Sequence, residues 1–203
     1  MIHEGMTPHF YPAGSGWIEV IAGCMFSGKT EELLRRINRA RIARQEVLVF
    51  KPAVDSRYAE TEVVTHNDVR IPCVPIKDAT QILDRVGDAV VVGIDEAQFF
   101  DDRLVAVAET LAEDGIRVII AGLDLDFRGR PFDPMPALLA VAESITKALA
   151  VCTVCGAPAS RSQRLVHRDS RVLLGATDVY EARCRRHWEP GQFDTPQEHL
   201  PLH

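Results

Sequence analysis

Residues 23–30 read GCMFSGKT, which fits the spacing G-x-x-x-x-G-K-[ST]. The stretch before it, WIEVIA at 17–22, is a short and mostly apolar run that is typical of a buried strand. The stretch after it, EELLRRINRARIAR at 31–44, repeats apolar residues at helical spacing, with arginines on the other faces. Strand, loop and helix in this order predict a loop that wraps a polyphosphate. Its backbone N–H groups point inward, Lys29 supplies a charge, and Thr30 offers a hydroxyl to Mg²⁺.

Beyond this loop, apolar segments alternate with amphipathic segments. Strands are expected over three apolar runs, 46–51, 89–94 and 116–124. Helices are expected over three runs of helical spacing, 79–86, 102–115 and 135–145. A polar stretch with embedded β-formers, 52–68, is expected to form an exposed hairpin. Because the strands are apolar throughout, the sequence predicts an α/β fold with a parallel sheet covered on both faces.

The chain changes character near residue 151, where long helical patterns give way to cysteine pairs and short β-like runs. At 203 residues and 46% hydrophobic residues, it can bury one core and add a small appendage. We therefore expect four segments: a flexible tail at 1–16, the α/β domain at 17–150, a small unit at 151–189 and a second flexible tail at 190–203.

The composition indicates the cellular location of the protein and the classes of partner that it binds. The five cysteines are not spaced as a disulfide framework, which indicates a reducing interior. No apolar run reaches the length of a membrane span, and the first residues lack the pattern of a secretory signal. The net charge of −6 argues against a polynucleotide partner. A cytoplasmic protein without a membrane or polynucleotide partner is expected.

Two acids follow the apolar strand at 89–94. Ligands of open α/β sheets bind outside the carboxyl ends of the strands, so Asp95 and Glu96 lie where a phosphate site needs them. Asp95 fits the acid that anchors Mg²⁺ through its water shell, opposite Thr30. Glu96 is interpreted as a base aimed at an acceptor molecule or at a water. The alternative is that Glu96 only starts the next turn in solvent.

Two short knuckles lie in the small unit, Cys152-x-x-Cys155 and Cys184-x-x-His187. Four ligands of these kinds match tetrahedral Zn²⁺, and a closed set of four protein ligands is structural rather than catalytic. The 28 residues between the two pairs must then form a hairpin or a long loop. The alternative is a pair of buried thiols beside a surface histidine.

Phenylalanines gather after strand ends although the chain is only 6% aromatic. Phe99, Phe100, Phe127 and Phe132 all follow predicted strands near the expected phosphate site. Core packing explains some of them, and the others are candidates for a slot that holds a flat ring by stacking.

Taken together, GCMFSGKT, IDEAQFF at 94–100, GLDLDFRGRPF at 122–132 and the paired knuckles resemble the type II thymidine kinase family, from about residue 17 to 188. The resemblance implies a P-loop NTPase (RecA-like) parallel sheet with a small zinc-binding lasso domain. It implies transfer of the γ-phosphate of ATP to the 5′-hydroxyl of thymidine, and also of deoxyuridine, with dTMP as the product from thymidine. It further implies Mg²⁺ with ATP, a structural Zn²⁺, a homotetramer and feedback inhibition by dTTP.

The resemblance also implies roles for single residues. Glu96 is implied as the catalytic base, and Thr30 and Asp95 as the magnesium residues. The implied ATP-phosphate residues are Gly23, Cys24, Met25, Phe26, Ser27, Gly28, Lys29, Thr30, Arg57, Asp95 and Gln98. The implied thymidine residues are Met25, Phe99, Leu123, Phe127, Phe132, Ser162, Arg171, Val172, Leu173, Leu174, Gly175 and Tyr180. Because several relatives have a cysteine where this chain has His187, a Cys₃His zinc site is implied, formed by Cys152, Cys155, Cys184 and His187.

Three other classes of protein share single features with this sequence. A nucleic-acid motor has similar acids after its strand, but it generally needs two RecA-like lobes and a basic track. A GTPase switch requires Asp-x-x-Gly at the strand end, where this chain has Asp-Glu-Ala-Gln. A zinc-ribbon adaptor would explain the knuckles and leave the phosphate loop without a use.

Overall fold

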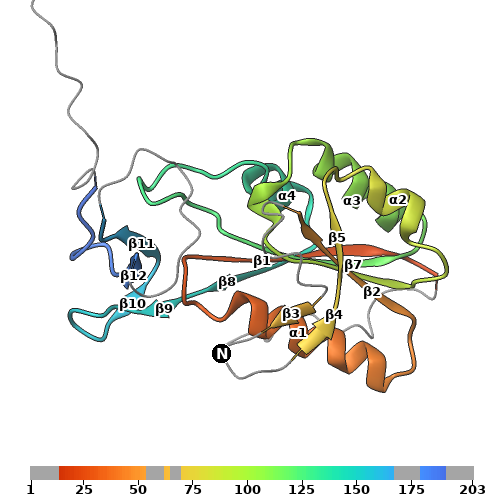
Figure 1. Ribbon diagram of the computed structural model, residues 1–203, viewed down its shortest axis with the longest axis horizontal. Helices are drawn as coiled ribbons and strands as arrows, with labels where there is room; N and C mark the ends of the chain where they lie inside the picture. The colour runs from red at the N-terminus through yellow and green to blue at the C-terminus, as the bar shows by residue number, and fades with distance from the viewer. Residues whose placement is uncertain (1–13, 54–61, 65–69, 167–178, 191–203) are drawn as a thin grey trace, which may run out of the picture.

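A computed structural model of the chain describes residues 14–53, 62–64, 70–166 and 179–190. Its centre is a six-stranded sheet in the order β5-β2-β6-β7-β1-β8 (Figure 1). All five ladders between neighbouring strands are parallel, so the predicted parallel α/β sheet is confirmed. The strands are β1 (Trp17–Gly23), β2 (Val47–Pro52), β5 (Val74–Ile76), β6 (Val91–Ile94), β7 (Arg117–Gly122) and β8 (Ser144–Ala148).

Helices cover both faces of this sheet, as predicted. Helix α1 (Lys29–Ile42) lies below the sheet in Figure 1, while α2 (Gln81–Arg85), α3 (Arg103–Glu113) and α4 (Met135–Val141) lie above it. The α1 face buries Leu33 and Ile37 against the sheet, and full burial of such a side chain stabilises the fold by about 1.5–3 kcal/mol. Two apolar cores on opposite faces therefore fix the carboxyl edge of the strands, where the phosphate loop begins.

The predicted helix over 135–145 is wrong in its second half. Helix α4 ends at Val141, Ala142 is already extended, and the chain continues as strand β8. This strand pairs with β1 from Glu19↔Ser144 to Gly23↔Ala148. The helical spacing of the apolar residues continued past the helix end, so local pattern favoured the helix, whereas the free edge of β1 selected a strand.

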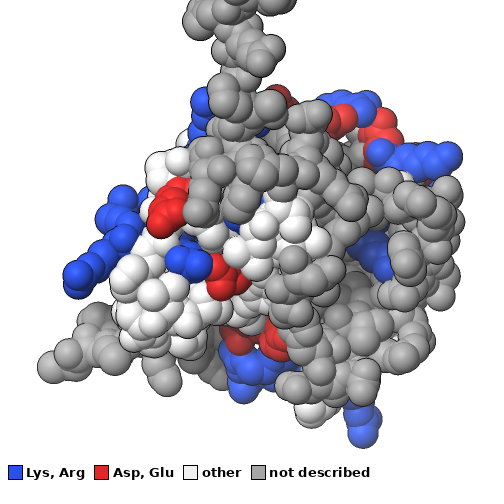
Figure 2. Space-filling view, turned by 60° about the vertical axis from the view of Figure 1, so that its left-hand side comes forward, with Lys and Arg blue, Asp and Glu red and all other residues white. Residues whose placement is uncertain are grey.

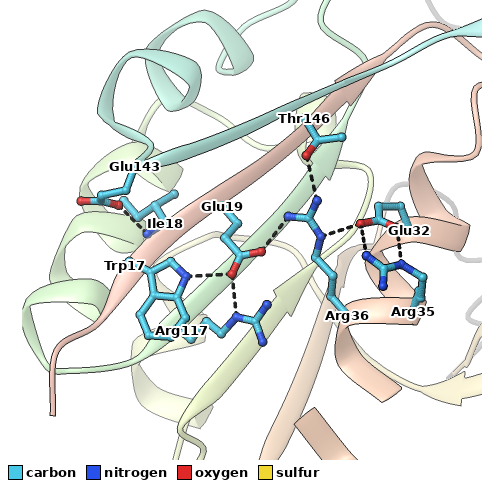
Figure 3. A network of polar contacts seen from close by, with 9 residues as sticks. All are labelled: Trp17, Ile18, Glu19, Glu32, Arg35, Arg36, Arg117, Glu143 and Thr146. Atoms are coloured by element: carbon cyan, nitrogen blue, oxygen red, sulfur yellow. Dashed lines mark hydrogen bonds and ion pairs between the residues drawn. The ribbon is translucent and has the colours of Figure 1, made fainter. Parts of the chain in front are cut away.

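A buried polar centre interrupts the otherwise apolar strand β1 (Figure 3). The Glu19 carboxylate accepts hydrogen bonds from Trp17 Nε1 at 2.7 Å, from Arg36 Nη1 at 2.6 Å and from Arg117 Nε at 2.6 Å. Burial by itself would raise the pKa of Glu19, but the hydrogen bond and charge of Arg117, with Trp17 and Arg36, outweigh it and lower the pKa. Glu19 therefore joins β1, α1 and β7 as a paired ion.

Shorter antiparallel pairs flank the main sheet. Strands β3 (Glu62–Val64) and β4 (Arg70–Pro72) pair at its margin, so the described part of the expected hairpin reaches beyond residue 68. The small unit consists of two pairs: β9 (Ala150–Val151) with β10 (Pro158–Ala159), and β11 (Arg161–Arg164) with β12 (Tyr180–Arg183). Within the residues that the structure describes, no helix combines the length and apolarity that a membrane crossing needs.

Candidate active site and metal centre

The phosphate loop joins β1 to α1 at the carboxyl edge of the sheet. Gly28 has φ +78°, in the left-handed region that glycine tolerates, and it directly precedes α1. A side chain at Gly23 would come within 2.4 Å of the Ala148 carbonyl oxygen, so the missed strand β8 is what requires glycine there. Lys29 Nζ donates to the Cys24 carbonyl at 2.7 Å across the loop. Burial lowers the pKa of Lys29, although the nearby carboxylate of Glu96 opposes this.

Asp95 and Thr30 meet across this loop, as the sequence predicts. Asp95 follows β6 and is buried, and Thr30 Oγ1 donates to its carboxylate at 3.3 Å. Burial raises the pKa of Asp95 to about 7, and the adjacent charge of Glu96 adds to the rise. A divalent cation would favour the ionised carboxylate, so an acid in this environment suits a metal-anchoring role.

Glu96 and Gln98 form the next part of the site. Glu96 is exposed, and its φ of +52° places it in the left-handed region at the start of the 3₁₀ helix η3 (Ala97–Phe99). Gln98 is 3% exposed, and its Nε2 donates to Glu96 Oε2 at 2.5 Å. The N–H of Leu123 donates to Gln98 Oε1 at 2.9 Å. The predicted contact of Gln98 with ATP phosphates stays a prediction, because its amide faces Glu96 and Leu123.

The candidate ring slot contains some of the expected phenylalanines. The rings of Phe99 and Phe132 meet edge to face with centroids 6.3 Å apart. Phe100 instead belongs to the core between the sheet and α3, so packing explains it. The predicted contacts of Phe99 and Phe132 with thymidine stay predictions.

Arg164 is a buried residue of this region that sequence reasoning missed. It is 2% exposed, and its guanidinium carbon lies 3.6 Å from the centroid of the Phe127 ring. Its Nη2 also donates to the Tyr180 hydroxyl at 2.9 Å. A planar guanidinium can stack on one ring while it donates to another group. The residue stands in a short β-like run, which carries no sequence signal for such a position.

The small unit contacts the phosphate loop directly. The N–H of Met25 donates to Ser162 Oγ at 3.1 Å, and Cys24 Sγ lies 3.4 Å from the Ala159 carbonyl oxygen. Cys24, one of the implied ATP-phosphate residues, has a side chain that is 1% exposed and packs into the apolar core of the small unit. Burial raises the pKa of the Cys24 thiol, which keeps it protonated. Arg57 and residues 171–175, expected near the phosphates and the thymidine, lie outside the described residues.

Four side chains of the small unit converge on one point. Ligand atoms of Cys152, Cys155, Cys184 and His187 all lie within 4.8 Å of one another. The sulfurs of Cys155 and Cys184 are 3.8 Å apart, and His187 Nδ1 lies 3.3 Å from Cys184 Sγ. A tetrahedral zinc site with bonds of about 2.0–2.3 Å places neighbouring ligand atoms about 3.3–3.8 Å apart. The cluster therefore fits a metal such as zinc, with His187 offering Nδ1.

The electrostatics of the cluster also favour a metal. Desolvation would raise the pKa of Cys152, but hydrogen bonds from the backbone N–H groups of Cys184, Val154 and Cys155 lower it to about 5. Metals bind the thiolate rather than the thiol, so these N–H groups prepare a ligand. Four protein ligands leave no open position, which is the arrangement of structural sites.

A glycine-rich loop between a buried parallel strand and a helix, with a buried acid opposite its threonine, places this chain among the P-loop α/β proteins. Residues 16–188 match the family model described as thymidine kinase. The chain is 60% identical over 175 residues to a thymidine kinase of Rhodothermus sp. (strain ITI 518), covering 86% of this chain and 82% of that protein. It is 54% identical over 192 residues to a thymidine kinase of Bdellovibrio bacteriovorus (strain ATCC 15356 / DSM 50701 / NCIMB 9529 / HD100), covering 94% of each. The chain belongs to the thymidine kinase family, which confirms the resemblance.

Proposed function

We propose that this protein is an ATP-dependent thymidine kinase, which transfers the γ-phosphate of ATP to the 5′-hydroxyl of thymidine and gives dTMP and ADP. Deoxyuridine is proposed as a second acceptor. The observation that carries the proposal is the hydrogen-bonded link from Glu96 through Gln98 to Leu123. It joins the candidate base at the phosphate loop to the segment that is expected to bind the nucleoside.

The phosphate loop supplies the ATP site in this proposal. Backbone N–H groups at the start of α1 and the Lys29 ammonium group bind the phosphates, and Thr30 and Asp95 hold Mg²⁺. The magnesium ion would neutralise charge on the phosphates. The hydrogen bond of Lys29 to the Cys24 carbonyl would be exchanged for bonds to phosphate, so the loop would need little rearrangement.

The proposed reaction transfers one phosphoryl group and one proton. A bond forms between the 5′-oxygen and the γ-phosphorus, the bond from phosphorus to the bridging oxygen of ADP breaks, and the hydroxyl proton passes to Glu96. Carboxylic acids and alcohols differ by about 11 pKa units, so removing the proton beforehand would cost about 15 kcal/mol. A turnover of about 10 s⁻¹ leaves a total barrier of about 16 kcal/mol. Glu96 therefore orients the hydroxyl and accepts its proton late.

The nucleoside site is proposed beside Glu96, between the segment that follows β7 and the edge of the phosphate loop at Met25. Phe99, Phe127 and Phe132 offer rings for stacking on the base, with Leu123 and Met25 at its edge. Ser162 and Tyr180 bring the small unit to the same place. Residues 171–175 would cover the base, as the family resemblance implies.

The family resemblance also supports a homotetramer, inhibition by dTTP and a cytoplasmic location, which we include in the proposal. Exposed apolar side chains lie on β8 and β9 and in the segments next to them, where a subunit contact would cover them: Ile145, Leu149, Val151 and Val154. On the described part of the face in Figure 2, Lys and Arg side chains are interspersed with acidic and neutral ones. That distribution gives no support to a basic track for a polynucleotide.

The direct test is an ADP-release assay on the purified protein with ATP, Mg²⁺ and each of the four natural deoxynucleosides. We expect turnover with thymidine and background rates with the other three. Deoxyuridine is then compared with thymidine under the same conditions. ATP consumption that is indifferent to every nucleoside would contradict the proposal and make water, or another molecule, the acceptor.

A further inference from the structure

We infer that Gln98 is a positioning residue, which holds the carboxylate of Glu96 in its reactive orientation and couples that orientation to the backbone of Leu123. The inference rests on the proposed function, in which Glu96 accepts the proton of the nucleoside hydroxyl. It assigns Gln98 to the acceptor side of the site, in addition to any contact with ATP.

The hydrogen bonds determine which way the Gln98 amide points. The backbone N–H of Leu123 can only donate, so the group it meets at 2.9 Å must be the oxygen, Oε1. The NH₂ group then faces Glu96 Oε2, which as a carboxylate oxygen can only accept, at 2.5 Å. Turning the amide over would set donor against donor and acceptor against acceptor. Both bonds therefore favour one orientation of a side chain that is 3% exposed.

Glu96 needs such a partner because its side chain is exposed. Its backbone is fixed, since its N–H donates to Asp95 Oδ1 at 3.0 Å and its carbonyl accepts from the N–H of Phe99 at 3.0 Å. An exposed glutamate side chain would still lose up to about 2 kcal/mol of rotamer entropy on being fixed. The bond from the buried amide fixes Oε2 before the substrate binds, and Oε1 remains to accept the proton.

The same amide reaches the segment expected to bind the nucleoside. Leu123 follows directly after β7, and the preceding Gly122 lets the amide approach the backbone. A side chain at Gly122 would lie 3.0 Å from Gln98 Oε1 and 2.6 Å from Met135 Sδ. A displacement of Leu123 would therefore be transmitted through the amide to Glu96. A correctly placed nucleoside base therefore coincides with a correctly oriented Glu96 carboxylate.

The test compares two substitutions that remove different bonds. Gln98→Glu retains an oxygen for the N–H of Leu123 but removes the NH₂ donor facing Glu96. Gln98→Met keeps the length of the side chain and removes both bonds. For each variant, kcat and the KM values for ATP and thymidine are measured, with the melting temperature.

We expect both variants to lose about 10- to 100-fold in kcat, because a hydrogen bond to a charged group is lost. The KM for ATP should change by less than about threefold. In a Glu96→Gln background the same substitutions should cost little more, since the carboxylate that Gln98 orients is then gone. The matched control is Gln163→Met, a buried amide that bridges Glu189 N–H and the Arg164 carbonyl, with kcat close to that of the original chain.

Values of kcat within about twofold of the original in both Gln98 variants, or full losses that persist in the Glu96→Gln background, would overturn the inference. A crystal structure of Gln98→Met provides a readout that does not depend on turnover. A displaced or disordered Glu96 carboxylate is expected, and an unmoved one overturns the inference. A displaced carboxylate in a protein that does not phosphorylate thymidine would instead leave the positioning role standing and refute the proposed function.

Discussion

Glu96, the proposed catalytic base, has a distinctive position among the side chains of the site. It follows the carboxyl end of β6, beside the buried Asp95, and its charge interacts with that of Lys29. A left-handed backbone at a residue other than glycine costs of order 1–3 kcal/mol, and such strain often marks functional sites. The strained backbone sends the chain into η3, which carries Gln98 back toward the carboxylate.

Replacing Glu96 by Gln should lower kcat by about 10²- to 10⁴-fold, because the amide cannot accept the hydroxyl proton. The KM values for ATP and thymidine should change little, since the size and hydrogen-bonding reach of the side chain are kept. Steady-state kinetics measures both effects, with Glu109→Gln on the exposed face of α3 as the control. Near-normal turnover in the Glu96 variant would remove this residue from the mechanism.

Arg164 should be needed for nucleoside binding rather than for ATP binding. Arg164→Lys keeps the charge but cannot stack a plane on Phe127, so we expect the KM for thymidine to rise by about tenfold or more. The KM for ATP should stay within about twofold. Tyr180→Phe is the companion variant, which removes only the hydroxyl that Arg164 contacts. Equal effects on both substrates would argue that Arg164 only supports folding.

At the scale of elements, the polar centre around Glu19 ties four parts of the fold together. Glu19 belongs to β1, its partners Arg36 and Arg117 belong to α1 and β7, and Arg36 also donates to Thr146 of β8 at 2.8 Å (Figure 3). These contacts lie on the α1 face of the sheet, toward the β8 edge. Burying an ion pair is costly, so the pair stabilises the fold only while both partners are present.

Glu19→Gln should destabilise the protein by about 3–5 kcal/mol at pH 7, because it removes the acid that pairs with Arg117 and leaves Arg36 with Glu32 alone, both arginines being largely buried. The matched control is Glu32→Gln, whose carboxylate is more exposed and whose loss should cost less than about 1 kcal/mol. Urea unfolding of both variants measures the difference. Similar losses in the two variants would contradict the role given to Glu19.

The contribution of Glu19 to the free energy of unfolding should decrease as the pH is lowered. Its pKa in the folded protein lies below the ordinary value of 4.5, so the unfolded chain binds the proton more readily. The stability that Glu19 provides is then fully present above pH 4.5 and is lost as the pH falls through the lowered pKa. In urea titrations, the gap between the original chain and Glu19→Gln should narrow below pH 4.5, and a gap that widens there would refute the assignment.

In the whole molecule, the phosphate loop lies against the small unit that carries the candidate metal centre. The small unit carries the candidate metal ligands, and it also supplies Ser162 to the N–H of Met25 and Ala159 to the thiol of Cys24. Both contacts fall on the phosphate loop. The structural integrity of the small unit therefore bears on the loop that is proposed to bind ATP.

Removing the metal should weaken ATP binding as well as lower stability. Treatment with a zinc-selective chelator, with Mg²⁺ in excess, should lower the melting temperature by about 5–10 °C if about 2–3 kcal/mol is lost. Titration calorimetry should show weaker ATP binding that returns when zinc is added back. Cys184→Ser should behave like the chelated protein, while Cys73→Ala, a buried cysteine outside the cluster, should respond to the chelator and to added zinc as the original chain does. Unchanged ATP affinity after metal loss would show that the two sites are independent.

The parallel sheet, the phosphate loop and the meeting of Thr30 with Asp95 could all be predicted from the amino-acid sequence. These follow from local patterns: apolar runs, the spacing of glycines around Lys29, and acids directly after a strand. The convergence of the two knuckles on one metal site could also be predicted, because cysteines and a histidine at this spacing have few functions other than metal binding. Each of these features is signalled by a short local motif, in which side-chain chemistry and spacing constrain the backbone, even where two motifs 65 residues apart meet, as Thr30 and Asp95 do.

Other features depend on contacts between distant segments and became visible in the folded chain. Strand β8 formed because β1 offered it a free edge, against the helical pattern of 135–145. Glu19 is buried in an apolar strand because arginines from α1 and β7 reach it. Gln98 faces Glu96 because the N–H of Leu123, 25 residues away, fixes its amide. Hydrogen bonds and packing between remote segments have no local signature, which is why sequence reasoning did not find them.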